Sequence, residues 1–249
     1  MVNPDWIIVC KFILGLLVVY LYYRWIKMAL IKLAPTIAHF FKLTKHYSLS
    51  TASGAVELPL IAVSHFIFCV FLARCLHVSL FQFSLFKISF YYFILAILLG
   101  IGMMGFSTLL CQAGIAIFQL FSPSESKPIE SWVALAKGGW LRHHSHTLQV
   151  LPYFLALLFI MLQIASEEMV FRGVFLKYFL SFGKMTAIIL STALFVLMQK
   201  FFMPSRLSAM FPMMGALVMG LVHAFLYTRL FLLMPLIVAH FVFFSFSVL

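Results

Sequence analysis

Acidic residues are scarce in this sequence, and so is charge of either sign. Six Asp and Glu stand against 17 Lys and Arg in 249 residues, and charged residues make up 9% of the chain. Soluble domains carry about 25% charged residues, so this composition excludes an ordinary soluble domain. Cysteine is also rare. The four cysteines include no Cys-x-x-Cys pair, which removes support for a zinc knuckle or a redox motif.

What the sequence has instead is long, continuous apolar runs. Hydrophobic residues make up 65% of the chain. A transmembrane β-barrel would show alternating segments of about ten residues, so continuous runs favour helices. We expect an all-α polytopic transmembrane bundle of about seven or eight helices, with residues 1–249 as one integral membrane domain. The basic residues flank apolar runs, which is typical of loops beside lipid headgroups and gives no support for nucleic-acid binding.

The apolar runs give the expected spans by their length, since a bilayer needs about 20 helical residues. They are residues 6–23, 58–76, 90–121, 148–180, 185–202, 211–227 and 232–249. The third run is long enough to tilt or split, and its glycines suggest close helix packing. The fourth would be about 50 Å long as one helix, so it must break or tilt steeply.

A basic stretch follows the first span. Its apolar residues repeat at helical spacing, which predicts an amphipathic helix in the membrane interface, interrupted near Pro35. A cytoplasmic loop packed on the bundle is the alternative, and the sequence does not separate the two. Five basic residues place this stretch on the cytoplasmic side. We expect a multi-pass protein of the inner or plasma membrane.

Residues 122–147 form the clearest polar loop, and they include His143, His144 and His146. Three close histidines resemble part of a metal site. No carboxylate or cysteine lies at short spacing to complete four ligands, so a wet basic loop is the better interpretation.

Glu167 and Glu168 stand side by side within the fourth apolar run. A carboxylate at membrane depth is costly unless it is paired or faces water, so it marks a functional site. Arg172 lies four residues after Glu168 and shares its helix face, which predicts an ion pair between them. Glu167 then points about 100° away and can face a cavity as a general base. A purely structural ion pair between helices is the alternative.

Three other polar residues lie in the apolar runs of the C-terminal third: Gln199, His223 and His240. A lone histidine on an apolar face is usually a core residue, and that is our interpretation of His223. Gln199 can orient a water or bond a neighbouring helix. We expect Glu167, Glu168, Arg172, Gln199 and His240 to converge on one polar cavity.

The motifs of residues 163–244 resemble those of the CPBP family, which includes type II CAAX prenyl endopeptidases and bacteriocin-processing or immunity proteins. Glu167-Glu168-x-x-x-Arg172 is similar to the first family motif. Phe195 to Gln199 has the spacing of the second, Phe-x-x-x-His, but ends in glutamine. His240 is similar to the start of the third, His-x-x-x-Asn, where Phe244 replaces the asparagine. Residues 148–249 are the expected core region of this type.

The resemblance implies an intramembrane endopeptidase in which Glu167 activates water and His240 binds the oxyanion. Glu168 and Arg172 would hold the geometry. Glutamine at position 199 cannot accept a proton from water, and phenylalanine at 244 cannot donate to an oxyanion. These departures leave open a catalytically impaired family member that acts as a binding or immunity protein, and an ion-coupled transporter or channel is less favoured. We expect no cofactor, with zinc less favoured than direct glutamate activation. The expected partners are the lipid bilayer and a peptide or membrane-protein substrate.

Overall fold

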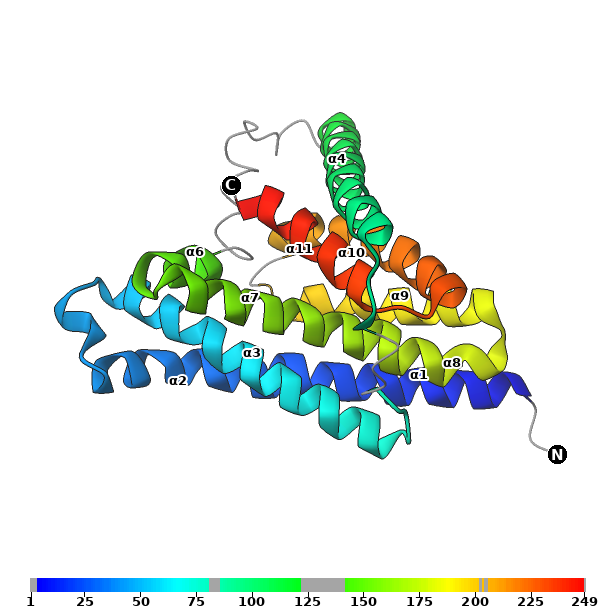
Figure 1. The fold of residues 1–249 in the computed structure, drawn as a ribbon, viewed down its shortest axis with the longest axis horizontal. Helices are drawn as coiled ribbons and strands as arrows, with labels where there is room; N and C mark the ends of the chain where they lie inside the picture. Colours follow the sequence, from blue (N-terminus) through cyan, green and yellow to red (C-terminus); the bar gives the residue numbers. More distant parts are fainter. Residues whose placement is uncertain (1–3, 81–85, 122–141, 202, 204–205, 249) are drawn as a thin grey trace.

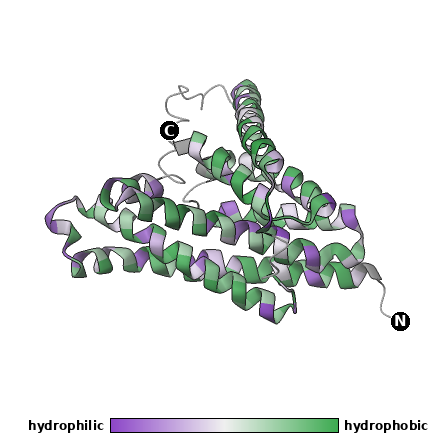
Figure 2. Cartoon of the chain, in the orientation of Figure 1, coloured by the Kyte–Doolittle hydropathy of each residue, from purple (hydrophilic) through white to green (hydrophobic). Residues whose placement is uncertain are grey.

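The computed structural model describes residues 4–80, 86–121, 142–201, 203 and 206–248. These residues form an all-helical bundle, as the sequence predicts. Within them, six helical runs are long and apolar enough to cross a membrane, and Met234–Phe246 is a shorter apolar helix. Figure 2 shows hydrophobic residues along most of each helix, with many hydrophilic residues near helix ends and where helices cross. The chain is therefore a multi-pass membrane protein.

The N-terminal helices form one continuous helical run, of which Trp6–Phe40 is long and apolar enough to cross a membrane. It consists of α1 (Pro4–Tyr20), the π-helical segment η1 (Leu21–Ile26) and α2 (Lys27–Phe40). The predicted interruption near Pro35 is wrong, because Pro35 lies inside α2. Membrane helices tolerate proline where neighbouring helices cover the freed backbone groups, and α2 packs against α3 (Leu49–Cys75). The stretch is a helix, as the first of the two interpretations expects, and it packs on the bundle through α3.

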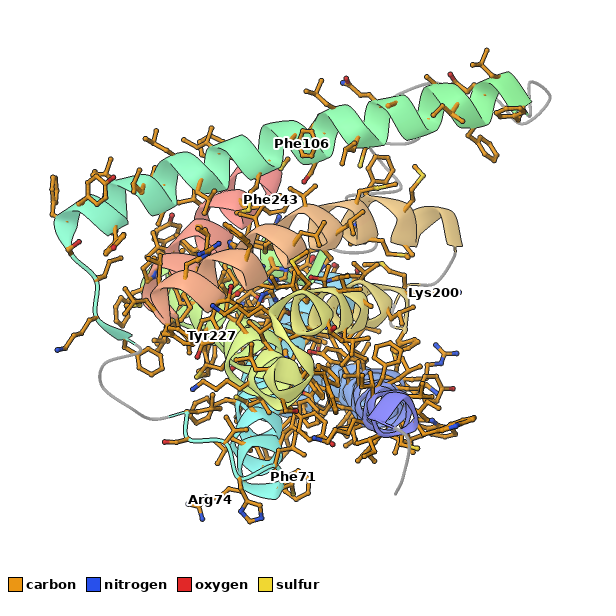
Figure 3. The ribbon with its side chains drawn as sticks, turned by 90° about the vertical axis from the view of Figure 1, so that its right-hand side faces the viewer. Phe71, Arg74, Phe106, Lys200, Tyr227 and Phe243 are labelled. Atoms are coloured by element: carbon orange, nitrogen blue, oxygen red, sulfur yellow. The ribbon has the colours of Figure 1, made fainter. Side chains whose placement is uncertain are left out.

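Helix α4 (Phe90–Phe121) is a single unbroken helix. It is inclined to the rest of the bundle (Figure 1) and packs against α11 (Met234–Val248) and α10 (Arg206–Leu230). Figure 3 shows α4 along one side of the bundle, with Phe71 and Arg74 of α3 on the opposite side. The close packing expected of its glycines occurs at Gly100, where a Cβ would lie 2.5 Å from the Ala239 carbonyl oxygen. The other three glycines of α4 face open space.

Helix α6 (Arg142–Val150) falls in the part of the predicted polar loop that the structure describes. The rest of that loop, residues 122–141, lies outside the described residues. The expectation of a wet loop is wrong for His143 and His144, which are 7% and 2% exposed. Their burial follows from the packing of α6 against α3. The side chain of Thr147 likewise donates a hydrogen bond to the Gly54 carbonyl of α3, at 3.4 Å.

The fourth apolar run, residues 148–180, is interrupted, as expected for a run too long to cross the membrane as one straight helix. The break lies at Leu151 and Pro152, between α6 and α7 (Tyr153–Glu168). The chain then continues as η6 (Met169–Leu176), α8 (Lys177–Phe179) and η7 (Leu180–Phe182). Segment η6 is π-helical, and all eight of its residues are buried. Short π-helical segments are frequent at functional sites, and this one begins directly after Glu168.

Two tightly packed helices complete the core around η6. Helix α9 (Lys184–Phe201) follows Gly183, whose φ of +97° suits glycine and lets the chain reverse after η7. Helices α9 and α10 are in close contact, because a Cβ at Gly220 of α10 would lie 2.6 Å from the Thr192 side chain of α9. This close approach places α10 directly beside η6.

Candidate active site

The two glutamates lie at the C-terminal end of α7, where the helix changes to the π-helical η6. Both are buried: Glu168 is fully covered and Glu167 is 7% exposed. Two adjacent carboxylates in the interior of a membrane bundle require compensating charges or hydrogen-bond donors. The structure supplies these from η6, α10 and α11.

Glu168 is surrounded by three nitrogen-bearing side chains. His240 Nδ1 is 2.8 Å from its Oε1, in a hydrogen bond. Arg172 Nε and His223 Nδ1 lie 3.3 and 3.1 Å from its Oε2 as ion-pair contacts, without the alignment of a hydrogen bond. The predicted pair between Glu168 and Arg172 is therefore present. These three cationic or donor groups stabilise the ionised form of Glu168. It is therefore suited to orient its neighbours rather than to exchange protons.

Arg172 is fixed by more than its carboxylate. Its Nη2 donates a hydrogen bond to the Met219 carbonyl of α10 at 3.3 Å. The guanidinium carbon lies 4.3 Å from the centre of the Phe195 ring, a cation–π contact. Arg172 therefore joins η6 to both α9 and α10.

Glu167 has a different environment from its neighbour. Gln163, one turn earlier on α7, donates to Glu167 Oε1 at 3.3 Å. His240 Nε2 lies 3.9 Å from Glu167 Oε2, beyond hydrogen-bond distance but within ion-pair distance. Its side chain is 10% exposed, against 0% for Glu168. Of the two carboxylates, Glu167 is therefore the less enclosed.

His240 links the two carboxylates through its two ring nitrogens. Since a carboxylate can only accept, the Nδ1 atom that bonds Glu168 carries a hydrogen. The ring is thereby oriented with Nε2 toward Glu167. Phe195 contacts the same ring edge-to-face, with centroids 6.3 Å apart. The structure thus brings together four of the five predicted site residues: Glu167, Glu168, Arg172 and His240.

Gln199, the fifth, makes no hydrogen bond to either carboxylate of the site. It lies on α9 one turn after Phe195 and is 5% exposed, and its Oε1 has no hydrogen-bond partner among the described residues. Phe244, on α11 one turn after His240, is buried against the His144 ring of α6 at a centroid distance of 4.4 Å.

Sequence reasoning missed several polar residues beside the carboxylates. A lone histidine on an apolar face predicts an ordinary core residue, whereas His223 contacts Glu168. Gln163 is also absent from the predicted site. Its spacing of four residues from Glu167 places both on one helix face and could have indicated the contact. Lys27 of α2 was counted only as part of a basic stretch, yet it is 2% exposed and within electrostatic range of Glu167. Its position four residues after Tyr23 places the two side chains on one helix face, which is the usable signal.

A second buried polar group surrounds Lys27. The Tyr23 hydroxyl lies 2.5 Å from His65 Nε2, and the Lys27 ammonium lies 5.5 Å from the centre of the Tyr23 ring. Next to them, the Tyr22 hydroxyl bonds Ser64 at 2.8 Å. Glu167 acts electrostatically on Tyr22 and Tyr23 as well. The buried Lys27, Tyr22 and Tyr23 of the N-terminal helices therefore lie within electrostatic range of Glu167.

The placement of the His, Cys, Asp and Glu side chains bears on whether the site could hold zinc. A catalytic zinc needs three protein ligands that converge on one point. Over the described ranges, no three His, Cys, Asp or Glu side chains are placed to do so. His240 Nδ1 is already committed to Glu168, which leaves it one nitrogen for any other partner.

The fold and the site together define a multi-pass helical membrane protein with a buried carboxylate–histidine centre. Residues 149–246, which carry most of that centre, match the family model described as Type II CAAX prenyl endopeptidase Rce1-like. This match confirms the resemblance to the CPBP family that the motifs predict. At the level of the family, the likeness is to CAAX-protease-like membrane peptidases. No curated protein and no solved structure matches the chain.

Proposed function

We propose that this protein is an intramembrane endopeptidase that uses Glu167 to activate water. One observation carries the proposal. Glu167 Oε2 and His240 Nε2 face each other at 3.9 Å in a buried site, while Glu168 holds the other nitrogen of His240. A carboxylate base beside an oriented imidazole, whose Nε2 can donate once it is protonated, is an arrangement suited to peptide hydrolysis.

The reaction follows from these positions. A water beside Glu167 and His240 gives a proton to Glu167 as its oxygen adds to the peptide carbonyl carbon. The carbonyl oxygen becomes an oxyanion, which accepts a hydrogen bond from His240 Nε2 when that nitrogen is protonated. The C–N bond then breaks, and Glu167 returns the proton to the leaving amine. Glu168 and Arg172 take no proton in this scheme, because they orient His240 and the π-helical segment.

Gln199 and Phe244 bear on the rate of this reaction. Gln199 makes no hydrogen bond to either carboxylate, and its amide cannot take a proton from water. Phe244 offers no donor to the oxyanion, and loss of one such donor typically costs about 10²–10³ in rate. We therefore propose a slow peptidase, whose substrate is a peptide or membrane protein in the inner or plasma membrane.

The test is cleavage of prenylated and unprenylated peptides by the purified protein in proteoliposomes. Glu167→Gln should lower turnover by about 10²–10⁴, the usual contribution of a general base. Ser166→Ala is the matched control, since Ser166 is adjacent and buried but bonds only the Leu162 carbonyl of its own helix. Equal turnover of the wild type and Glu167→Gln would contradict the proposal.

A catalytically impaired member that binds a peptide without cutting it is the second candidate. The buried contact between Phe244 and His144 favours it, because an apolar ring stands where the family motif has an asparagine. The combined change Gln199→His and Phe244→Asn separates the candidates. A large gain of cleavage that Glu167→Ala abolishes would identify an impaired enzyme. Appreciable turnover of the wild type would show that the present residues suffice.

A further inference from the structure

His223 is a buried titratable group that the proposed reaction does not use. It lies on α10, is 0% exposed, and its Nδ1 is 3.1 Å from Glu168 Oε2. Its ring centroid is 6.4 Å from that of His240. Glu168 therefore has one histidine at each carboxylate oxygen, His240 at Oε1 and His223 at Oε2.

Electrostatics indicates which nitrogen of His223 carries its hydrogen. An imidazole lone pair 3.1 Å from a carboxylate oxygen would repel it, and the repulsion is weakly screened because both side chains are fully buried. A hydrogen on Nδ1 reverses the sign. His223 therefore attracts Oε2 while His240 bonds Oε1, and the two contacts together restrict rotation of the Glu168 carboxylate about its terminal torsion.

The backbone around His223 is built to keep this contact. Arg172 donates to the Met219 carbonyl, one turn before His223 on α10, so two successive turns of α10 contact Arg172 and Glu168. Gly220 lets α10 approach Thr192 of α9, where a Cβ would lie 2.6 Å from the Thr192 side chain. Helix α10 is thus held against η6 and α9 by contacts at Met219 and Gly220, about one turn before His223.

We propose that His223 is a positioning residue of the active site, acting through Glu168 on His240. The proposal rests on the peptidase function proposed above. With His223 in place, Glu168 keeps Oε1 on His240 Nδ1, and His240 presents Nε2 to Glu167. Without it, Oε2 retains only Arg172, Glu168 gains freedom to rotate, and the His240 ring loses its fixed orientation. The reacting groups then spend less time in the productive geometry, which lowers kcat and leaves KM unchanged.

Three substitutions test which atom of His223 matters. Asparagine places an amide nitrogen close to the position of Nδ1, glutamine places one close to Nε2, and leucine has the size of asparagine without a donor. His223→Leu should lower kcat by about 10²-fold, the loss expected when reacting groups are misplaced by about 1 Å. His223→Asn should recover most of that loss, and His223→Gln less of it. Thermal unfolding in detergent, run on all three, separates a positioning effect from a loss of fold.

A second readout does not depend on turnover. In protein labelled with ¹⁵N-histidine, the ring nitrogens of His240 are assigned by the signals lost in His240→Gln. We expect the Nδ1–H form of His240 in the wild type and in His223→Asn, and a mixture of tautomers in His223→Leu. An unchanged His240 spectrum in a folded His223→Leu protein would overturn the proposal, as would equal kcat in the Leu and Asn variants. If the wild type cuts no peptide but the spectra change as expected, the peptidase proposal fails and the positioning contact stands.

Discussion

Removing the charge of Glu168 should cost far more than removing that of Glu167. Glu168→Gln leaves Arg172, 1% exposed, without its carboxylate, and breaking a buried ion pair in this way costs about 3–5 kcal/mol. Glu167→Gln keeps an oxygen that accepts from Gln163, so its free energy of unfolding should stay close to that of the wild type. Thermal or denaturant unfolding in detergent compares the two.

The outcome separates two roles that sequence alone leaves open. Equal destabilisation by both substitutions would mean that Glu167 is a structural charge like Glu168, and would weaken its assignment as the base. Arg172→Met in combination with Glu168→Gln is the control. It removes both charges, and should recover part of the stability lost in Glu168→Gln alone, because no uncompensated ion then remains buried.

The residue contacts that were predictable are the local ones. Glu168 and Arg172 were expected to pair because helical geometry makes residues four apart neighbours, and the π-helical turn between them still leaves 3.3 Å between Nε and Oε2. His223 could not be predicted in the same way. Its contact with Glu168 depends on the depth and rotation of α10 against η6, which Gly220 and Arg172 set and which no periodicity in the sequence encodes.

At the scale of elements, the lengths of the apolar runs predict which segments are long helices, whereas the positions of prolines predict the helix ends poorly. Pro152 ends one helix and begins the next, whereas Pro35 and Pro59 lie inside helices that continue. The difference is the environment, since a proline whose freed backbone groups are covered by neighbouring helices need not break a membrane helix. Which case applies depends on packing partners that are distant in sequence.

Gly100 and Gly102 of α4 lie two residues apart, on opposite faces of the helix. Replacing each with alanine should change the free energy of unfolding in opposite directions. A methyl group at Gly100 would meet the Ala239 carbonyl oxygen at 2.5 Å, so Gly100→Ala should destabilise the protein by about 1–3 kcal/mol through overpacking. At Gly102 nothing lies within 4 Å, so Gly102→Ala should stabilise α4 by up to about 1 kcal/mol through helix propensity. Unfolding in detergent measures both.

The same pair tests how α4 bears on the site. Ala239 precedes His240, so a shift of α11 away from α4 at Gly100→Ala would move the histidine as well. We expect Gly100→Ala to lower any peptide turnover and Gly102→Ala to leave it unchanged. Equal effects of the two substitutions on stability would show that α4 does not pack on α11 as closely as the structure has it.

At the scale of the whole molecule, the length of the N-terminal helical run limits how it can be placed in the membrane. Trp6–Phe40 has 35 residues and would extend about 50 Å, against a hydrocarbon core of about 30 Å. Part of the run must therefore tilt or leave the core. Lys27, one of the basic residues of this stretch, is buried in the bundle, whereas Lys32, Lys42 and Lys45 are exposed. The exposed ones are those that can interact with the membrane surface.

These exposed lysines predict the orientation of the whole bundle. Basic residues near the end of a span favour the cytoplasmic side, so the turn after α2 should be cytoplasmic. Because α3 crosses the membrane next, its two ends lie on opposite sides, with Lys45 before it and Ser79 after it. In a variant without the four native cysteines, a cysteine at Lys45 should react with an impermeant maleimide only after the membrane is opened. A cysteine at Ser79 should react in intact cells. The reverse pattern would place the basic turn outside, and labelling of both positions in intact cells would mean that α3 does not cross the membrane.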